Sequence, residues 1–555
     1  MKYFCKTLVL GMVIGVMTML PIGKAYSQSL PKPAVVISIA QFKEQMDSIN
    51  YLLTASGFAQ MKFMAKAMIS GYTKGLDSEK AAGVLLYFTK DSEEPDFLAF
   101  VPVTDIEEML DVIAGMAEVE EDDDFTTVIT DQGLELLIKE QNGIAFISNN
   151  EEMFADLPDA PAELLGELPT KYNLAARVFG QRIPKELRTQ ILDLIKDSSE
   201  QTLDAIDSDV QAELQKQNMA LQMKQVELVF NESDTLTLGM KADEDAKSLL
   251  MDIEFTAVPN SELAEKITGA DSKKESRFTG FLMDGAAFNY HQNFAIDEED
   301  AKNYSTMLDE LQKTVVSEMD QDGDFSDSEL ATIESAFGNI VDVIKATLTE
   351  GIIDTGAVVM LEDGEMNIAA GAQVADPGKV EATLKELAAM AEEKLADELE
   401  VNLNSGSHKD ITFHQFVAQV PDDAEELRDS LGDQVTVVVG IGSKEVYFGA
   451  GSNPIKTLKN AIDGTEATKD LLQYNLYIAP ILKFAAKAEG DPMVESMADA
   501  MEETGNDRIQ MKLNLIKNGA NMRFEMQDGI LSLIKVGVEA FGQGNGGFPG
   551  GDDDF

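Results

Sequence analysis

Acidic side chains outnumber basic ones by 99 to 44 in this chain of 555 residues, giving a formal net charge of −55 at neutral pH. Chains with so high a net charge are commonly disordered. Here, however, 44% of the residues are hydrophobic, and Leu, Ile, Val, Phe and Met recur throughout. That fraction is sufficient to build cores. We therefore expect most of the chain to fold.

The charge also restricts the partners of the folded chain. A strongly negative field repels the phosphates of nucleic acids and the headgroups of anionic lipids, so we expect neither as a partner. Divalent cations and basic protein surfaces are favoured. After residue 27 no apolar run is long enough to cross a bilayer, so we also expect no membrane span.

Residues 1–27 have the three parts of a cleavable secretory signal peptide. Two lysines come first, an apolar run follows at 8–20, and the small-residue exit is Ala25-Tyr26-Ser27. The apolar run would rise only about 20 Å as a helix, whereas a hydrocarbon core is roughly 30 Å thick, so a membrane anchor is the weaker interpretation. We predict export to a periplasm or to the outside, a choice that the sequence leaves open.

Cys5, the only cysteine, lies within the predicted signal peptide. Cleavage would leave no cysteine for disulfides, so stability must come from core burial and bound metal. The length suggests two to four domains.

Short identities recur in the same order in the two halves of the chain. Tyr172-Asn173-Leu174 matches Tyr474-Asn475-Leu476, and Gln222-Met223-Lys224 matches Gln510-Met511-Lys512. The strings at 222–224 and 510–512 each open a predicted strand pair. The first pair is 226–230 with 235–240, and the second is 513–517 with 521–526. Chance matching explains any one of these identities, but their shared order favours an internal duplication.

Alternating apolar and polar residues in these strands predict antiparallel sheets with one face covered by amphipathic helices, such as 183–195 and 384–395. Asp105 and Asp376 are candidate N-caps for two further helical segments. The predicted fold class is α+β, with two related copies of an antiparallel sheet covered by amphipathic helices and a helix-loop-helix in the second copy. The predicted divisions are copy 1 at 30–260, copy 2 at 275–541, and a disordered Gly- and Asp-rich tail at 542–555.

An acidic loop at 318–329 lies between two segments of helical period, 300–317 and 330–347. Oxygen-bearing side chains stand at alternate positions of the loop, and Gly323 stands at its turn. Calcium takes six to eight oxygen ligands, which this spacing directs inward. The alternative is a plain acidic turn, as at 120–124. The predicted calcium ligands are Glu318, Asp320, Asp322, Asp324, Ser326 and Glu329.

Residues 300–347 resemble the EF-hand family of calcium-binding proteins. The resemblance implies that Glu329 is a bidentate ligand at loop position 12, that Asp324 binds through its backbone carbonyl, and that Ser326 holds or bridges a water. Glu318 departs from the family, which has Asp at loop position 1. A single loop of this kind implies a weak structural clamp. As a whole the chain resembles large secreted bacterial proteins of unknown function.

No other motif points to chemistry. The histidines His291, His408 and His414 are scattered, and we expect them to be satisfied or on the surface. Nucleophile-elbow, zinc-protease, P-loop and dinucleotide motifs are all missing from the sequence. With 99 carboxylates, no catalytic pair can be singled out. We therefore predict a protein that is not an enzyme.

The preferred hypothesis is an exported, acidic, non-catalytic scaffold or binding protein that binds calcium. An alternative is a periplasmic carrier or chaperone for apolar ligands, either lipid or peptide. The stripe Met61, Met64 and Met68 fits a pliant apolar groove, although core packing is its ordinary explanation. A second alternative is an exported hydrolase that uses carboxylates.

Overall fold

The computed structural model describes residues 32–544 except 89–94, 123, 131–132, 204–218, 220–222, 323–325, 363, 395–398, 421–427, 429–431 and 467. The predicted signal peptide and residues 545–555 of the predicted tail therefore lie outside the described residues. The chain divides into two compact units. The first comprises the chain up to Leu194 together with Val229–Val258, and the second comprises Ile195–Leu228 and the chain from Pro259.

The first unit is built on short strands with helices between them. Its helices are α2 (Phe42–Ala55), α3 (Lys62–Tyr72), α4 (Ile106–Ala114), α5 (Leu168–Lys171) and the start of α6 (Lys185–Leu203). Its strands are β1 (Val35–Ile39), β2 (Ala82–Tyr87), β3 (Asp96–Pro102), β4 (Glu118–Glu121), β5 (Thr126–Ile129), β6 (Glu135–Gln141), β7 (Ile144–Ser148), β8 (Leu174–Phe179), β9 (Ser233–Asp243) and β10 (Ser248–Ala257).

All described pairings within this unit are antiparallel, in the order β4-β5-β6-β7-β3-β2-β1-β8-β9-β10. Successive residues of a strand point to opposite faces, so β2 and β3 contribute to two cores. One contains Leu85, Phe100 and Phe146. The other contains Val84 and Met109 of α4. Both cores draw on β2, β3 and β7, and neither includes a residue of β9 or β10.

The second unit contains longer helices. They are α8 (Glu262–Gly269), α9 (Glu298–Asp322), α10 (Asp327–Thr349), α11 (Pro377–Lys394), α13 (Pro454–Asp463), α14 (Ile478–Glu489), α15 (Pro492–Thr504) and α16 (Gly529–Gly544). Its strands are β11 (Phe288–Ala295), β12 (Ile352–Glu362), β13 (Glu365–Gln373), β14 (Leu399–His408), β15 (Ile411–Gln419), β16 (Gln434–Ile441), β17 (Glu445–Gly451), β18 (Leu472–Tyr477), β19 (Arg508–Ile516) and β20 (Gly519–Gln527).

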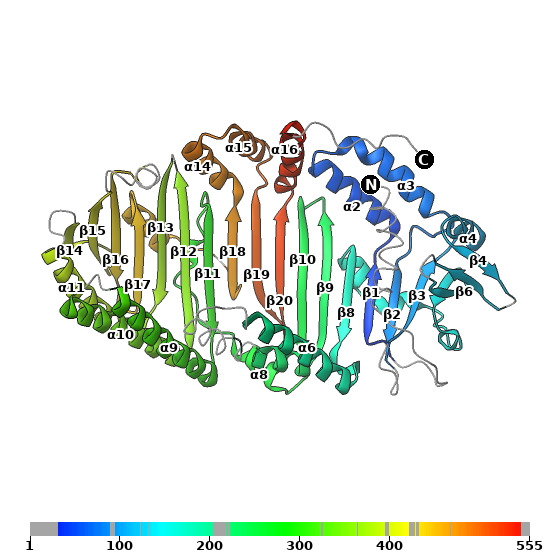
Figure 1. Cartoon of the computed structure of the whole chain (residues 1–555), viewed down its shortest axis with the longest axis horizontal. Coiled ribbons are helices and arrows are strands. Elements are labelled where there is room, and N and C mark those ends of the chain that lie inside the picture. The colour runs from blue at the N-terminus through cyan, green and yellow to red at the C-terminus, as the bar shows by residue number, and fades with distance from the viewer. Residues whose placement is uncertain are drawn as a thin grey trace. The chain divides into compact units, whose positions relative to one another are not determined.

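Described pairings in this unit are again antiparallel, in the order β14-β15-β16-β17-β13-β12-β11-β18-β19-β20. In the main core, Phe278 and the α13 residue Leu458 pack against β12, β13 and β15–β17. A Cβ on Gly371 would lie 2.7 Å from the Phe278 ring, so glycine is needed for this approach. Figure 1 shows α9–α11 along one end of these strands and α14 and α15 at the other.

The predicted fold class is wrong. The described part of the chain contains a large antiparallel sheet of twenty strands, and it does not divide clearly into two separate copies. Pairing orders are alike in the two units, but lengths differ: β4 and β5 have 4 residues each, whereas β14 and β15 have 10 and 9. The repeated string at 172–174 leads into β8, whereas its match at 474–476 lies inside β18, so this identity does not define a copy.

Several individual elements follow the sequence closely. The side chain of Asp105 accepts a hydrogen bond from the Glu108 amide, and Asp376 accepts one from the Lys379 amide, so both predicted N-caps are confirmed. The predicted strand at 226–230 is wrong, because this segment is helical. Its residues lead directly into β9, where the strand begins at Ser233.

Candidate functional site

The predicted calcium loop is divided between two helices. The backbone of Glu318, Asp320 and Asp322 belongs to α9, which therefore extends beyond the predicted start of the loop. Asp324 lies outside the described residues. Ser326 is the N-cap of α10, and Glu329 lies in its first turn. Of the six predicted ligands, the structure shows contact between Ser326 and Glu329, and calcium binding stays a prediction.

Glu329 already has partners in this structure. Its Oε2 accepts hydrogen bonds from the Ser326 amide at 2.8 Å and from the Ser326 hydroxyl at 2.7 Å. Its Oε1 lies 3.0 Å from Nζ of Lys394. The Ser326 hydrogen bonds and the Lys394 ammonium together lower the pKa of Glu329 to about 2. This carboxylate therefore fixes the start of α10. Binding of calcium by both of its oxygens would displace these contacts.

Within the described residues, no group of three or more His, Cys, Asp or Glu side chains is placed to hold a metal ion. His408 is partly exposed and lies 2.9 Å from Asp463. His291 and His414 are buried, and neither ring nitrogen of His291 has a hydrogen-bond partner. The expectation of satisfied or surface histidines is therefore wrong for His291. Burial lowers the pKa of both buried imidazoles.

Asp354 is the buried carboxylate that best fits a catalytic role in a hydrolase, the second alternative. It lines a pocket of about 350 Å³ with Arg277 and Lys444. Burial raises the pKa of Asp354. Its oxygens accept hydrogen bonds from the Ser276 hydroxyl and from the Arg277 amide. These bonds hold the segment that carries Phe278 into the core. The arrangement indicates a structural role for Asp354.

An exposed apolar surface covers strands β8, β9 and β10 of the first unit. Leu236, Leu238 and Met240 of β9 are 37%, 47% and 45% exposed, and Met251 of β10 is 39% exposed. Their cross-strand partners are apolar as well. We call this surface apolar face 1; its nine residues are Leu174, Ala176, Val178, Leu236, Leu238, Met240, Met251, Ile253 and Phe255.

The opposite side of these strands is polar and buried. Asp252 and Thr237 are 1% and 2% exposed. The Tyr172 hydroxyl donates to Asp252 at 2.9 Å, and Nε of Arg177 donates to the Thr237 hydroxyl at 2.9 Å. A Cβ on Gly239 would lie 2.5 Å from the Tyr172 ring, so the glycine lets the ring lie flat on the sheet. The ordinary arrangement, apolar side inward and polar side outward, is reversed here.

Strands β18, β19 and β20 of the second unit carry a comparable surface. Every residue on it is partly exposed, including the aromatic Tyr474 and Phe524. The Tyr474 ring packs edge-on against Phe288 of β11, with centroids 5.0 Å apart. We call this surface apolar face 2; its nine residues are Leu472, Tyr474, Leu476, Ile509, Met511, Leu513, Met522, Phe524 and Met526.

Beneath apolar face 2 lies a ladder of buried amides. Nδ2 of Asn475 donates to Oδ1 of Asn289 at 2.6 Å, and Nε2 of Gln510 donates to Oδ1 of Asn475 at 2.6 Å. Nδ2 of Asn289 donates to the Met283 carbonyl at 3.0 Å. The three side chains are at most 5% exposed. Like Asp252 and Tyr172, they make the inward side of the sheet the polar one.

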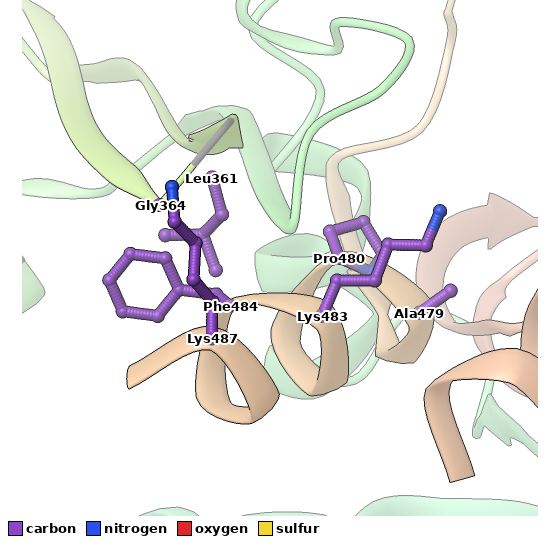
Figure 2. A pocket seen from close by; sticks show the side chains of 7 residues that line it. All are labelled: Leu361, Gly364, Ala479, Pro480, Lys483, Phe484 and Lys487. Atoms are coloured by element: carbon purple, nitrogen blue, oxygen red, sulfur yellow. The ribbon is translucent and has the colours of Figure 1, made fainter. Parts of the chain in front are cut away.

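Figure 2 shows a pocket between α14 and the turn that joins β12 to β13. Its volume is about 360 Å³. Both of its charged lining residues are lysines, which project from α14 with their nitrogen atoms apart. The lining residues are Leu361, Gly364, Ala479, Pro480, Lys483, Phe484 and Lys487.

The methionine stripe of the first unit is not part of a core. None of the residues of α3 is buried; Phe63 is 84% exposed and Met64 is 43% exposed. The explanation by core packing is therefore wrong for this helix. It adds further exposed apolar surface to the unit that bears apolar face 1.

The sequence analysis missed both apolar faces because alternation shows which residues share a face and does not show which face is buried. A usable signal was present. The residues that alternate with Leu236, Leu238 and Met240 are threonine and glycine, and those alternating with Tyr474 and Leu476 include Asn475.

Comparison of the chain with protein-family models, curated proteins and solved structures finds no match. No helix among the described residues is both long and apolar enough to cross a membrane. The geometry of the two faces therefore carries the functional argument by itself.

Proposed function

We propose that this protein is a non-catalytic carrier that shields apolar ligands on its two apolar faces. The observation that carries the proposal is the reversed burial of β8–β10, where leucine and methionine are exposed and Asp252 is enclosed. Monomeric proteins rarely expose contiguous apolar patches of this kind unless the patch binds something. Burial of apolar surface supplies roughly 25 cal/mol for each Å², which favours an apolar occupant.

The charge of the chain selects among possible occupants. A second copy would bring another −55 charges toward the same surface, which disfavours pairing of two copies through these faces. Anionic membrane surfaces are repelled for the same reason. A small ligand with a long apolar part adds little charge and fits an open sheet face, so it is the occupant that we propose.

A neutral fluorescent dye tests this function. Nile red titrated into the full chain should bind, and Leu238→Asp should weaken binding by about tenfold or more, because a carboxylate buried without a partner is costly. Leu403→Asp is the matched control, since Leu403 of β14 is 39% exposed and lies outside both faces. Equal dye binding by wild type and Leu238→Asp would refute the role of apolar face 1.

Sedimentation of the wild-type chain and the same two variants tests the competing occupant, which is a second copy of this chain. A dimer of the wild-type chain that Leu238→Asp dissociates and Leu403→Asp does not would assign apolar face 1 to contacts between copies. That result would overturn the carrier proposal. A monomer at all concentrations that binds dye would support it.

A further inference from the structure

We propose that the lysine pocket beside α14 binds the carboxylate of a long-chain fatty acid whose acyl chain lies on apolar face 2. The inference rests on the carrier function proposed above and names its ligand class. It depends on three observations: the pocket adjoins the apolar face, its walls are apolar, and its charged groups are both cationic.

The pocket and apolar face 2 share one side of the sheet. Val359 of β12 pairs with Phe288 of β11, which pairs with Leu476 of the face. Leu361 lies two residues beyond Val359, so both side chains point to the same side of β12. Leu361 also lines the pocket. A chain that starts at the pocket therefore meets Val359 and Phe288 before it reaches apolar face 2.

The two lysines supply positive charge where the remaining lining is apolar. Lys483 and Lys487 are one helical turn apart on α14, with Phe484 and Pro480 beside them (Figure 2). A Cβ on Gly364 would lie 2.5 Å from Nζ of Lys487, so this ammonium sits against the turn between β12 and β13. An apolar wall beside two ammonium groups matches an amphiphile that carries one anionic end.

Lys483 is available to a ligand because its present ion pair is weak. Its Nζ lies 3.0 Å from Glu502 of α15, and the two side chains are 51% and 64% exposed. Exposed pairs of this kind contribute little to stability, so a ligand carboxylate can replace Glu502 at little cost. Lysine ammonium groups act as compact point charges that bind carboxylate and phosphate alike, so dodecanoate and dodecyl phosphate are the probes that distinguish the two headgroups.

The acidity of the whole chain gives the pocket its selectivity. With 99 acidic residues, most of the surface repels anions, whereas the charged residues among the described lining are two lysines, one of them paired with the exposed Glu502. The field should thus direct an anionic headgroup to this end of the face. An uncharged amphiphile would gain nothing from the lysines.

Calorimetry with the full chain tests the assignment, using dodecanoate and dodecanol below their aggregation concentrations. Wild type should bind dodecanoate about tenfold more tightly than the double variant Lys483→Gln, Lys487→Gln. Dodecanol should bind both proteins equally. Lys456→Gln on α13 is the matched control, and it should leave both affinities unchanged.

The possible failures are distinguishable. Dodecanoate binding that the double variant does not weaken would overturn the headgroup site, and dodecanol binding would then still support the carrier. If neither compound binds, both proposals fail. Tighter binding of dodecyl phosphate through the same lysines would overturn the carboxylate. Should the double variant unfold, Lys483→Arg with Lys487→Arg retains the charge and should retain dodecanoate binding, whereas its loss would overturn the proposal.

Discussion

Apolar faces 1 and 2 are both supported by a polar inward side, but the polar groups differ. Under face 1 they are the buried carboxylate of Asp252, which accepts from Tyr172, and the partly buried guanidinium of Arg177, which donates to Thr237. Under face 2 they are neutral amides in a ladder from Asn289 to Gln510. Either chemistry pairs the enclosed polar atoms of these side chains, so the reversal does not depend on one particular residue type.

The largest expected effect comes from breaking the neutral ladder. Asn475→Leu would leave a buried acceptor on Asn289 and a buried donor on Gln510 without partners. Each unsatisfied group costs about 1–3 kcal/mol, so we expect the free energy of unfolding to fall by about 2–4 kcal/mol. Urea denaturation measures this loss. Asn402→Leu on β14, whose amide bonds to Glu400 at the surface, is the control and should change little. A loss below that of the control would contradict the role of the ladder.

A smaller loss should follow from Tyr172→Phe under face 1. The ring is kept and fills the space above Gly239, but Asp252 loses the hydroxyl donor at 2.9 Å. Hydrogen bonds to charged groups contribute about 1.5–3 kcal/mol, so the unfolding free energy should fall by about 2 kcal/mol. Thermal and urea melts of the variant measure it. Unchanged stability would show that Asp252 does not depend on this donor.

The smallest expected effect is a pH dependence beneath face 2. Burial lowers the pKa of His291 in the folded chain, whereas the unfolded chain keeps a value near 6.5. The unfolded state therefore binds the proton first, and stability is lost as the pH falls through 6.5 toward the lower folded value. His291→Leu should flatten this loss in urea melts between pH 7.5 and 5.5. His414, which shifts in the same direction, supplies a residual slope that His414→Leu should remove.

Sequence reasoning was most successful for local elements. The strands predicted at 235–240, 513–517 and 521–526 overlap β9, β19 and β20, and Asp105 and Asp376 are N-caps as predicted. These features depend on a few neighbouring residues. The segment 226–230 failed because apolar residues at alternate positions also fit one side of a short helix.

What the sequence could not supply was the direction of burial. Asn475 becomes an inward group because Asn289 and Gln510, far away in the chain, pair with it across the sheet. Face 1 depends in the same way on Tyr172, which meets Asp252 from 80 positions away. The lysine pocket brings together a strand end and a helix more than 100 positions apart, which no local pattern reveals.

The amide ladder also determines how these strands must align as the chain folds. A shift of one residue in β18 or β19 would turn Leu, Met and Tyr side chains inward. The hydrophobic effect by itself would favour this shifted register. The ladder opposes the shift, since mutual pairing of all three amides is available only in the native alignment. The apolar binding surface therefore stabilises a competing register in which it is buried. The buried amides destabilise that register, because they lose their hydrogen bonds in it.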